Sequence, residues 1–219
     1  MSLITENPRV CDAILFESGR EINYARDQIT VVSGTVASAI GQVLGQITKG
    51  AITAAAGANT GNGTCTALTL GANAKVGAYT LKFTAATAFI VTDPNGVQLT
   101  NGVNGAYTDS QINFTITAGG TAFVAGDTFT ITVAAGSGKW NQVTPAAVDG
   151  TQTAAGVLVG GAFTATLGAD ATAVAVTRGP ATLKLNGLAW TAAMSGPQKT
   201  AAIAQLQALG ITTRTDYGV

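Results

Sequence analysis

Residues 126–133 read Gly-Asp-Thr-Phe-Thr-Ile-Thr-Val, and in this stretch Phe129, Ile131 and Val133 alternate with threonine. Because successive side chains of a β-strand point to opposite faces, the alternation predicts a strand with one buried face. Similar runs, rich in β-branched and aromatic residues, occur at 68–70, 79–83 and 112–116. The centre of the chain is therefore predicted to be a set of half-buried β-strands.

A turn motif lies within this central region. Asp93-Pro94-Asn95-Gly96 carries Asp first, Pro second and Gly fourth, which is the chemistry of a type I turn. We expect it to join strands at 89–92 and 97–99. The stretches 77–83 and 126–132 also echo each other weakly, either as a true repeat or because simple strand sequences converge.

The flanking regions are predicted to be β-rich as well, with one short helix near the C-terminus. Ser195-Gly196-Pro197 provides a polar or glycine cap followed by proline in the first turn. Ala202, Ile203, Leu206 and Leu209 then form an apolar stripe, and Gly210 lies where a C-terminal glycine cap belongs. The flanking strands are expected at 28–32, 43–47, 156–159, 173–177 and 181–185.

A helix of about three turns is marginal by itself and must dock on a sheet. We therefore expect Trp190, Ile203, Leu206 and Leu209 to be core anchors of the flanking domain.

The distribution of charge indicates the domain boundaries. Residues 1–50 hold nine charged side chains, whereas residues 51–138 hold five. Small-residue stretches at 54–63 and 134–138 resemble linkers at domain edges. We predict a discontinuous β domain formed by 17–57 and 139–219, with a small β-sandwich module inserted at 58–138.

Composition argues against several classes of function. Charged residues make up 10% of the 219 residues and balance to a net charge of zero, so no basic stripe for nucleic acid is present. The chain has no histidine, which removes the commonest general base and the usual zinc ligand. Cys11 and Cys65 could pair, but two free cysteines in a reducing cytosol are the preferred interpretation.

Individual candidates for chemistry have simpler structural interpretations. Gly136-Ser137-Gly138-Lys139 lacks the preceding glycine and the following Ser or Thr of a phosphate-binding loop. Asp93, Asp109 and Asp127 each fall at a predicted turn and lack the spacing of a calcium loop. We expect no catalytic, metal or cofactor site, and therefore a structural protein rather than an enzyme.

Targeting signals are not visible in the sequence. Charged residues occur early in the N-terminal region, and no stretch approaches the roughly 18 to 20 apolar residues of a membrane span. We expect a soluble protein, made in a cytoplasm, that has no membrane partner.

Three C-terminal stretches, taken in order, resemble the lambda-type bacteriophage head decoration proteins. In that family an Arg-Gly-Pro-Ala strand precedes a Trp-containing strand and a short Ala/Leu helix that ends in Leu-Gly-Ile. The matching stretches here are 173–181 (AVAVTRGPA), 188–190 (LAW) and 199–211 (KTAAIAQLQALGI). Residues 29–47 are similar to the first strands of the family. The family's small founding members lack the inserted module.

The resemblance implies a homotrimeric cement protein that binds the outside of an expanded phage head at its three-fold positions. Its partner would be the major capsid protein, and its location the outer surface of the virion, after synthesis in the cytoplasm of the bacterial host. The resemblance also implies that an N-terminal arm, here residues 1–16, adds a strand to capsid segments. The residues assigned to capsid binding within this arm are Glu6, Asn7, Pro8, Arg9 and Val10.

A different display role remains as the alternative. A phage or cell-surface adhesin whose β module binds carbohydrate would share the Gly, Thr and Ala-rich composition. It would not explain the Trp-containing strand and the capped C-terminal helix.

Overall fold

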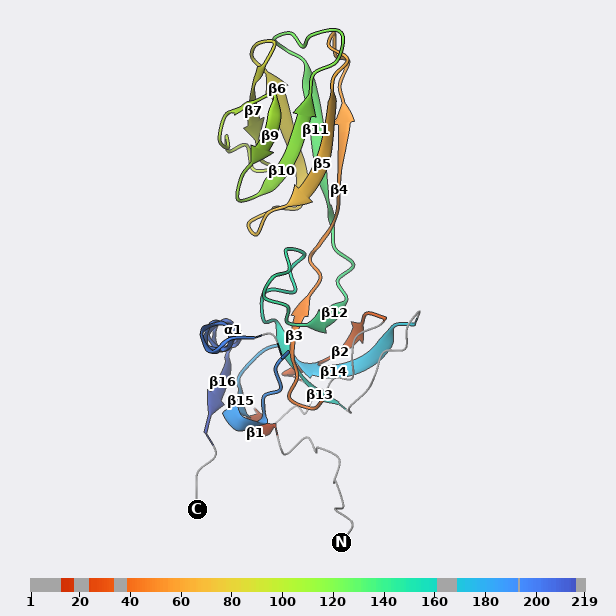
Figure 1. Cartoon of the computed structure of the whole chain (residues 1–219). Helices are drawn as coiled ribbons and strands as arrows, with labels where there is room; N and C mark the ends of the chain where they lie inside the picture. Colours follow the sequence, from red (N-terminus) through yellow and green to blue (C-terminus); the bar gives the residue numbers. More distant parts are fainter. Residues whose placement is uncertain (1–12, 18–23, 34–38, 161–168, 193, 216–219) are drawn as a thin grey trace. The chain divides into compact units, whose positions relative to one another are not determined.

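The computed structural model describes residues 13–17, 24–33, 39–160, 169–192 and 194–215 (Figure 1). Within these residues the protein is mainly β with one α-helix near the C-terminus, which confirms the predicted fold class. The chain divides into two compact units. Unit 1 comprises Met1–Ile47 and Gly138–Val219, and unit 2 comprises Thr48–Ser137.

Unit 1 contains a closed five-stranded barrel with strand order β12-β2-β14-β13-β3. The pairs are antiparallel except that β12 lies parallel to β2. The barrel strands are β2 (Arg26–Val31), β3 (Val43–Gln46), β12 (Trp140–Gln142), β13 (Gly156–Gly160) and β14 (Ala171–Val176).

Strand β13 is apolar on both faces because each face is covered by a different hydrophobic cluster. In β13, Leu158 belongs to one cluster with Trp140, whereas Val157 and Val159 belong to the other. Alternation along the strand therefore divides its side chains between two cores. This explains why four consecutive residues of β13 are buried.

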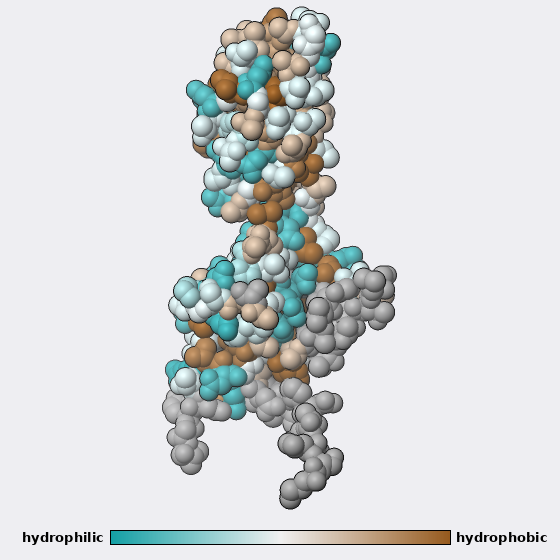
Figure 2. Space-filling view, viewed as in Figure 1, coloured by the Kyte–Doolittle hydropathy of each residue, from teal (hydrophilic) through white to brown (hydrophobic). Residues whose placement is uncertain are grey.

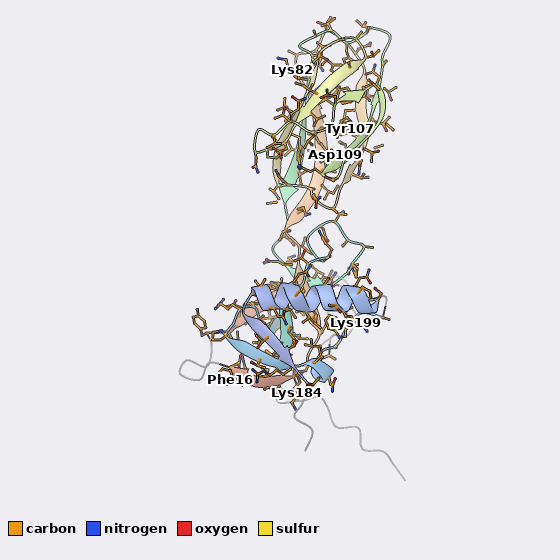
Figure 3. The ribbon with its side chains drawn as sticks, turned by 90° about the vertical axis from the view of Figure 1, so that its left-hand side faces the viewer. Phe16, Lys82, Tyr107, Asp109, Lys184 and Lys199 are labelled. Atoms are coloured by element: carbon orange, nitrogen blue, oxygen red, sulfur yellow. The ribbon has the colours of Figure 1, made fainter. Side chains whose placement is uncertain are left out.

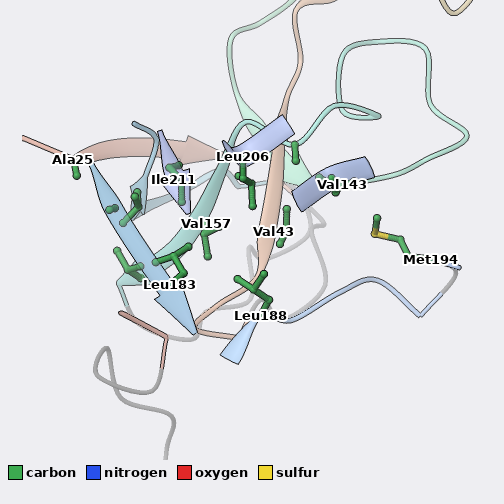
Figure 4. Packing of buried hydrophobic residues seen from close by; sticks show 14 residues of the cluster. Ala25, Val43, Val143, Val157, Leu183, Leu188, Met194, Leu206 and Ile211 are labelled. Carbon is green, nitrogen blue, oxygen red and sulfur yellow. The ribbon is translucent and has the colours of Figure 1, made fainter. Parts of the chain in front are cut away.

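A three-stranded sheet and the helix form the rest of unit 1. The sheet has the order β1-β15-β16, with β1 antiparallel and β16 parallel to the central strand. Its elements and the two helical segments are β1 (Ile14–Glu17), β15 (Ala181–Lys184), the 3-10 turn Leu185–Gly187, α1 (Gly196–Ala208) and β16 (Ile211–Arg214). Side chains from this sheet, from α1 and from the barrel meet in the cluster that contains Val157 and Val159 (Figure 4).

Helix α1 begins and ends where the sequence predicts. Ser195 is the N-cap of a capping box, in which its backbone N–H donates to the Gln198 side chain at 2.8 Å. At the other end Gly210 adopts a φ of +78°, and its N–H donates to the Gln207 carbonyl at 2.9 Å. A glycine in this conformation ends a helix without steric cost.

Unit 2 is built from two sheets around one core. The five-stranded sheet has the order β4-β11-β6-β7-β8, and the three-stranded sheet has the order β5-β10-β9. The strands are β4 (Lys49–Ala56), β5 (Thr64–Leu70), β6 (Gly77–Phe83), β7 (Ala88–Thr92), β8 (Gly102–Val103), β9 (Gly105–Thr108), β10 (Ile112–Thr117) and β11 (Thr128–Ala135).

Aromatic rings fill the core of unit 2. Phe83 stacks on Phe123 with ring centroids 4.0 Å apart, and Tyr107 stacks on Phe114 at 4.6 Å. Phe89 lies between these pairs, 5.6 Å from Phe83 and 5.8 Å from Phe114. Such contacts add to the stabilisation from burying apolar area. Figure 2 shows the outer surface of unit 2 largely in pale colours, as its Thr, Gly and Ala content implies.

The two weakly echoing stretches are neighbours in one sheet, since β6 and β11 pair antiparallel from Thr128 opposite Lys82. The predicted strand at 97–99 is reduced to a single bridge between Thr92 and Gln98, whereas β7 pairs with β8 further along.

Unit 2 begins ten residues before the predicted boundary at 58. Strand β4, which was predicted to lie in the flanking domain, pairs with β11 along its length. The alanine-rich sequence of β4 resembles a linker. Small side chains are equally compatible with an edge strand, which is what this segment forms. The C-terminal boundary, at 137/138, lies one residue from the predicted position.

Candidate functional site

The three-stranded sheet of unit 1 exposes a large aromatic side chain. Phe16, on edge strand β1, is 56% exposed and lies opposite Thr182 of β15. A register shift between Ile14 and Phe16 marks a bulge, and bulges re-aim side chains at sheet edges. Ile14 packs against the core, whereas Phe16 faces solvent. Figure 3 shows Phe16 and Lys184 on this sheet.

An open groove of about 440 Å³ lies beside Phe16. It is lined by Leu15, Phe16, Thr182 and Arg214, which come from all three strands of the sheet. The groove thus combines an apolar surface with one guanidinium group. Hydrophobic residues gather at this end of unit 1 in the space-filling view (Figure 2).

Ion pairs fix the residues around this sheet. Glu17 pairs with Arg26, whose Nε lies 2.9 Å from both carboxylate oxygens, and this hydrogen bond raises the pKa of Arg26. Asp27 accepts hydrogen bonds from Thr177 and from Arg178, which lower the pKa of its carboxyl group. These ion pairs join β1 to β2, and β2 to the segment that follows β14.

Arg178 also contacts an exposed aromatic ring. Its Cζ lies 5.7 Å from the ring centroid of Tyr24, which is 55% exposed. A guanidinium at this distance over a tyrosine makes a cation–π contact. Arg178 therefore joins Asp27 and Tyr24 on the surface of unit 1.

The Arg-Gly-Pro and Leu-Gly-Ile motifs meet in space. The Gly179 N–H donates to the Leu209 carbonyl at 2.8 Å, and a Cβ added at Gly179 would lie 1.9 Å from the Gly210 carbonyl oxygen. Only glycine at position 179 permits this approach of the two backbones. The two motifs therefore form one packing contact between the start of β15 and the end of α1.

The predicted core anchors occupy different depths. Leu206 is fully buried, and Trp190 and Ile203 are partly buried against the same cluster. Leu209 differs from the prediction because it is 40% exposed. It is the C-cap residue of α1, where the backbone leaves the helical path, so the periodicity of the stripe no longer sets its direction.

The predicted arm residues Glu6, Asn7, Pro8, Arg9 and Val10 lie outside the described residues, as does Cys11. Cys65 is a free thiol in β5, and burial raises its pKa to about 11. A thiol of this kind is a poor nucleophile at neutral pH.

The aspartates considered as candidate ligands in unit 2 stabilise turns. Asp127 accepts backbone hydrogen bonds from Thr60, Gly61 and Val124 at 2.9 to 3.1 Å. Asp109 likewise accepts one from Gln111 at 2.9 Å. Among the residues that the structure describes, no three His, Cys, Asp or Glu side chains are grouped to hold a metal ion.

The described part of the chain also contains no helix with the length and apolarity needed to cross a membrane.

Sequence reasoning missed the exposed aromatic residues of unit 1. Phe16 follows Ala13, Ile14 and Leu15, and such a short apolar run reads as a buried segment. Only the bulge and the pairing with β15 show that Phe16 faces outward.

Comparison with solved structures gives a limited likeness. Two crystal structures of FlgL from Xanthomonas campestris match at 24% identity with a TM-score of 0.33. The matches cover 48% and 47% of this chain and about a third of the FlgL chain. No curated protein matches the sequence significantly.

Comparison with protein families shows to which family the chain belongs. The family described as bacteriophage lambda head decoration protein D matches residues 3–211, a span that includes most of both segments of unit 1 and the whole of unit 2. The match also covers the contact between the Arg178-Gly179-Pro180 and Leu209-Gly210-Ile211 motifs. The chain belongs to the family of lambda-type phage head decoration proteins.

Proposed function

We propose that this protein binds the outer surface of an expanded tailed-phage head and stabilises the head against the pressure of packaged DNA. The observation that carries the proposal is the family match over residues 3–211. Head decoration places the protein on the virion capsid, and its role there is structural. A ligand that binds only the assembled, expanded state stabilises that state by mass action.

The partner in this proposal is the major capsid protein, contacted by a homotrimer at the three-fold positions. Three linked copies raise the effective concentration of each contact, so individually weak contacts suffice. Residues 1–16 would add a strand to a capsid segment, a mode of binding in which main-chain hydrogen bonds supply the affinity. Glu6 to Val10 would lie within this added strand.

The exposed face of the β1-β15-β16 sheet supports this arrangement. Strand β1 pairs only with β15 among the described strands, so its second edge is available for a further strand. Phe16 and the adjacent groove lie on β1, which includes the last three residues of the predicted 1–16 arm; these residues pair with β15 within unit 1. Burial of one phenylalanine on binding contributes on the order of 1.5 to 3 kcal/mol.

The test is to add purified protein back to expanded heads that lack it. We expect saturable binding and a higher temperature of head disruption, measured by release of DNA. Intact, expanded and matched heads that show no binding, or binding without any gain in resistance to heat or chelator, would contradict the proposal.

Matched variants test whether the exposed face of the β1-β15-β16 sheet contacts the head. Phe16→Ser is expected to weaken binding by about tenfold or more, as the loss of its burial implies. Val103→Ser is the control, because Val103 is 63% exposed on unit 2. Analytical ultracentrifugation of the free protein and stoichiometry on the head test the trimer.

A further inference from the structure

The chain passes from unit 1 to unit 2 at the end of strand β3. Ile47 directly follows β3 and is the last residue of unit 1 before unit 2, and Gly138 is the first residue of unit 1 after it. The Ile47 N–H donates to the Lys139 carbonyl at 2.8 Å, so both connections to unit 2 lie side by side. We call this region the insertion end of unit 1.

The described N-terminal chain begins near the other end of β3. The carbonyl of Ala13 accepts a hydrogen bond from the N–H of Lys184, the last residue of β15, at 2.9 Å. Beyond the 3-10 turn that follows β15, the Ala189 carbonyl accepts from the N–H of Val43, the first residue of β3, at 3.1 Å. We call the region of Ala13 and Val43 the arm end, and β3 carries the chain about 13 Å from there to Ile47.

Strand β2 connects the same two ends. Its first residue, Arg26, pairs with Glu17 of β1. Just after its last residue, the Val32 N–H donates to the Trp140 carbonyl at 3.0 Å, next to Lys139. Figure 1 shows β1 and the passage from β3 toward unit 2 on opposite sides of unit 1.

The exposed aromatic side chains lie at the arm end. Among the residues that the structure describes, Phe16 and Tyr24 are the aromatic residues that are exposed. Phe16 is on β1, and Tyr24 comes two residues before the start of β2. Large aromatic residues are enriched at protein interfaces and often dominate their binding energy. The arm end therefore has the composition of a contact surface.

Unit 2 has neither an exposed aromatic ring nor a core shared with unit 1. All residues of its hydrophobic cluster lie between 52 and 133, and the two clusters of unit 1 lie outside this range. Its seven Phe and Tyr side chains are all buried, and its exposed large hydrophobic residues are valines. Singly exposed apolar residues of this size are ordinary on a protein surface.

We propose that unit 1 faces the phage head with its arm end, and that unit 2 is carried on the side away from the head as a display module. This arrangement rests on the proposed function, which places Glu6 to Val10 in a strand added to the capsid. Capsid protein that covers the arm end leaves the insertion end uncovered. Unit 2 then makes no contact with the capsid, and its surface is open to partners outside the virion.

Photo-crosslinking with the full chain tests this orientation. The photoreactive residue p-benzoylphenylalanine replaces Tyr24 in one variant and Val103 in another, two positions that are 55% and 63% exposed. After irradiation of decorated heads, we expect a crosslink to the major capsid protein from position 24 and none from position 103. Unfolding midpoints are recorded for every variant.

Further positions guard against a variant that does not fold. Position 16 replaces position 24, and position 97 replaces position 103, because Val97 and Val103 lie at opposite ends of β7. A crosslink from unit 2 to the major capsid protein would overturn the proposal. Crosslinks from the arm end to other copies of this chain alone would also overturn it.

Access to a label gives an independent measurement. Biotin is attached through p-azidophenylalanine at position 103 or at position 24, and intact decorated heads are passed over immobilised streptavidin. Heads with the label at position 103 should be retained, and heads with the label at position 24 should pass through. Retention in the reverse order would contradict the proposed orientation.

The two proposals can fail separately. If wild-type protein does not bind expanded heads, the proposed function fails. If the wild type binds and unit 2 crosslinks to the capsid, or its biotin is shielded on the head, the orientation alone fails.

Discussion

At the scale of single residues, Gly179 and Gly210 allow two backbone segments of unit 1 to pack closely where the C-terminal motifs meet. Gly179 approaches the backbone of Gly210 so closely that an added Cβ would lie 2.2 Å from the Gly210 carbonyl carbon. Contacts with backbone atoms cannot be relieved by a change of rotamer. The motif therefore requires glycine for backbone packing.

Gly179→Ala is expected to destabilise unit 1 by roughly 1 to 3 kcal/mol, the usual cost of overpacking. Trp140 and Trp190 are the chain's two tryptophans and both belong to unit 1, so denaturation followed by tryptophan fluorescence reports on that unit. Gly196→Ala is the control, because an added Cβ there meets nothing within 4 Å. Equal midpoints for the two variants would contradict the packing argument.

Asp93 plays a comparable role in unit 2. The residue is 3% exposed, and its carboxylate accepts from the Asn95 and Val97 N–H groups at 2.8 and 2.9 Å and pairs with Lys75. The hydrogen bond from Lys75, followed by these backbone bonds, lowers its pKa from 3.8 to about 2. The folded state therefore binds the proton less well than the unfolded state does.

Because the pKa of Asp93 is depressed, its stabilisation is present above pH 3.8 and is lost as the pH falls through about 2. Asp93→Asn keeps an acceptor oxygen but loses the charge. Thermal unfolding followed by circular dichroism should show a lower Tm for Asp93→Asn at neutral pH. The difference from the wild type should narrow between pH 4 and pH 2 (about the two pKa values), and a constant difference would refute this role.

At the scale of elements, helix α1 contributes to the core through a narrow stripe. Ala202 and Leu206 are its buried residues, and Ile203 packs partly against the same cluster. The sequence stripe continues to Leu209, but that side chain is 40% exposed after the helix ends. The helix is thus docked mainly by its middle turns.

Leu206→Ala should cost about 2 to 5 kcal/mol of unit 1 stability, the range for a buried leucine. Leu209→Ala on the same helix should cost less than about 1 kcal/mol, because less apolar area is buried there. Urea denaturation followed by tryptophan fluorescence measures both. A cost for Leu209→Ala as large as that for Leu206→Ala would show that the exposed C-cap residue is a core anchor after all.

At the scale of the whole molecule, unit 2 is an insertion between two paired strands. The Ile47 N–H donates to the Lys139 carbonyl at 2.8 Å, and the Gly138 N–H donates to the Ile47 carbonyl at 3.0 Å. Since β3 and β12 are antiparallel neighbours, the chain leaves and returns at one point of unit 1. Neither unit needs the other to complete a sheet.

Replacing residues 48–138 by Asn-Gly should leave unit 1 folded, because that dipeptide closes a two-residue hairpin. We expect its tryptophan-monitored stability to stay within about 1 kcal/mol of the full chain, the size of an ordinary surface change. Loss of cooperative unfolding would mean that unit 1 depends on the insertion.

The boundary of unit 2 can be tested with two fragments. Residues 48–137 should unfold cooperatively, whereas 58–138 should be much less stable because it lacks β4 and leaves β11 without its edge partner. Circular dichroism during thermal unfolding compares them. Equal stability would favour the boundary at 58.

The sequence by itself determined the strands with clear alternation and the two ends of the helix. Alternation of threonine with Phe129, Ile131 and Val133, and the caps at Ser195 and Gly210, are local signals that neighbouring residues express directly. The order of the C-terminal motifs also identified the family. These features depend on the periodicity of apolar residues and on helix caps, and both can be recognised in short stretches of sequence.

Only the tertiary structure decided the features that depend on partners distant in the chain. The alanine-rich 49–56 segment forms a strand because β11 pairs with it, and Phe16 faces outward because of a bulge against β15. One groove of unit 1 is lined both by Gln152 and by residues of α1, some fifty residues later in the chain. Pairing, burial and the direction of side chains arise from these long-range contacts, which local periodicity does not encode.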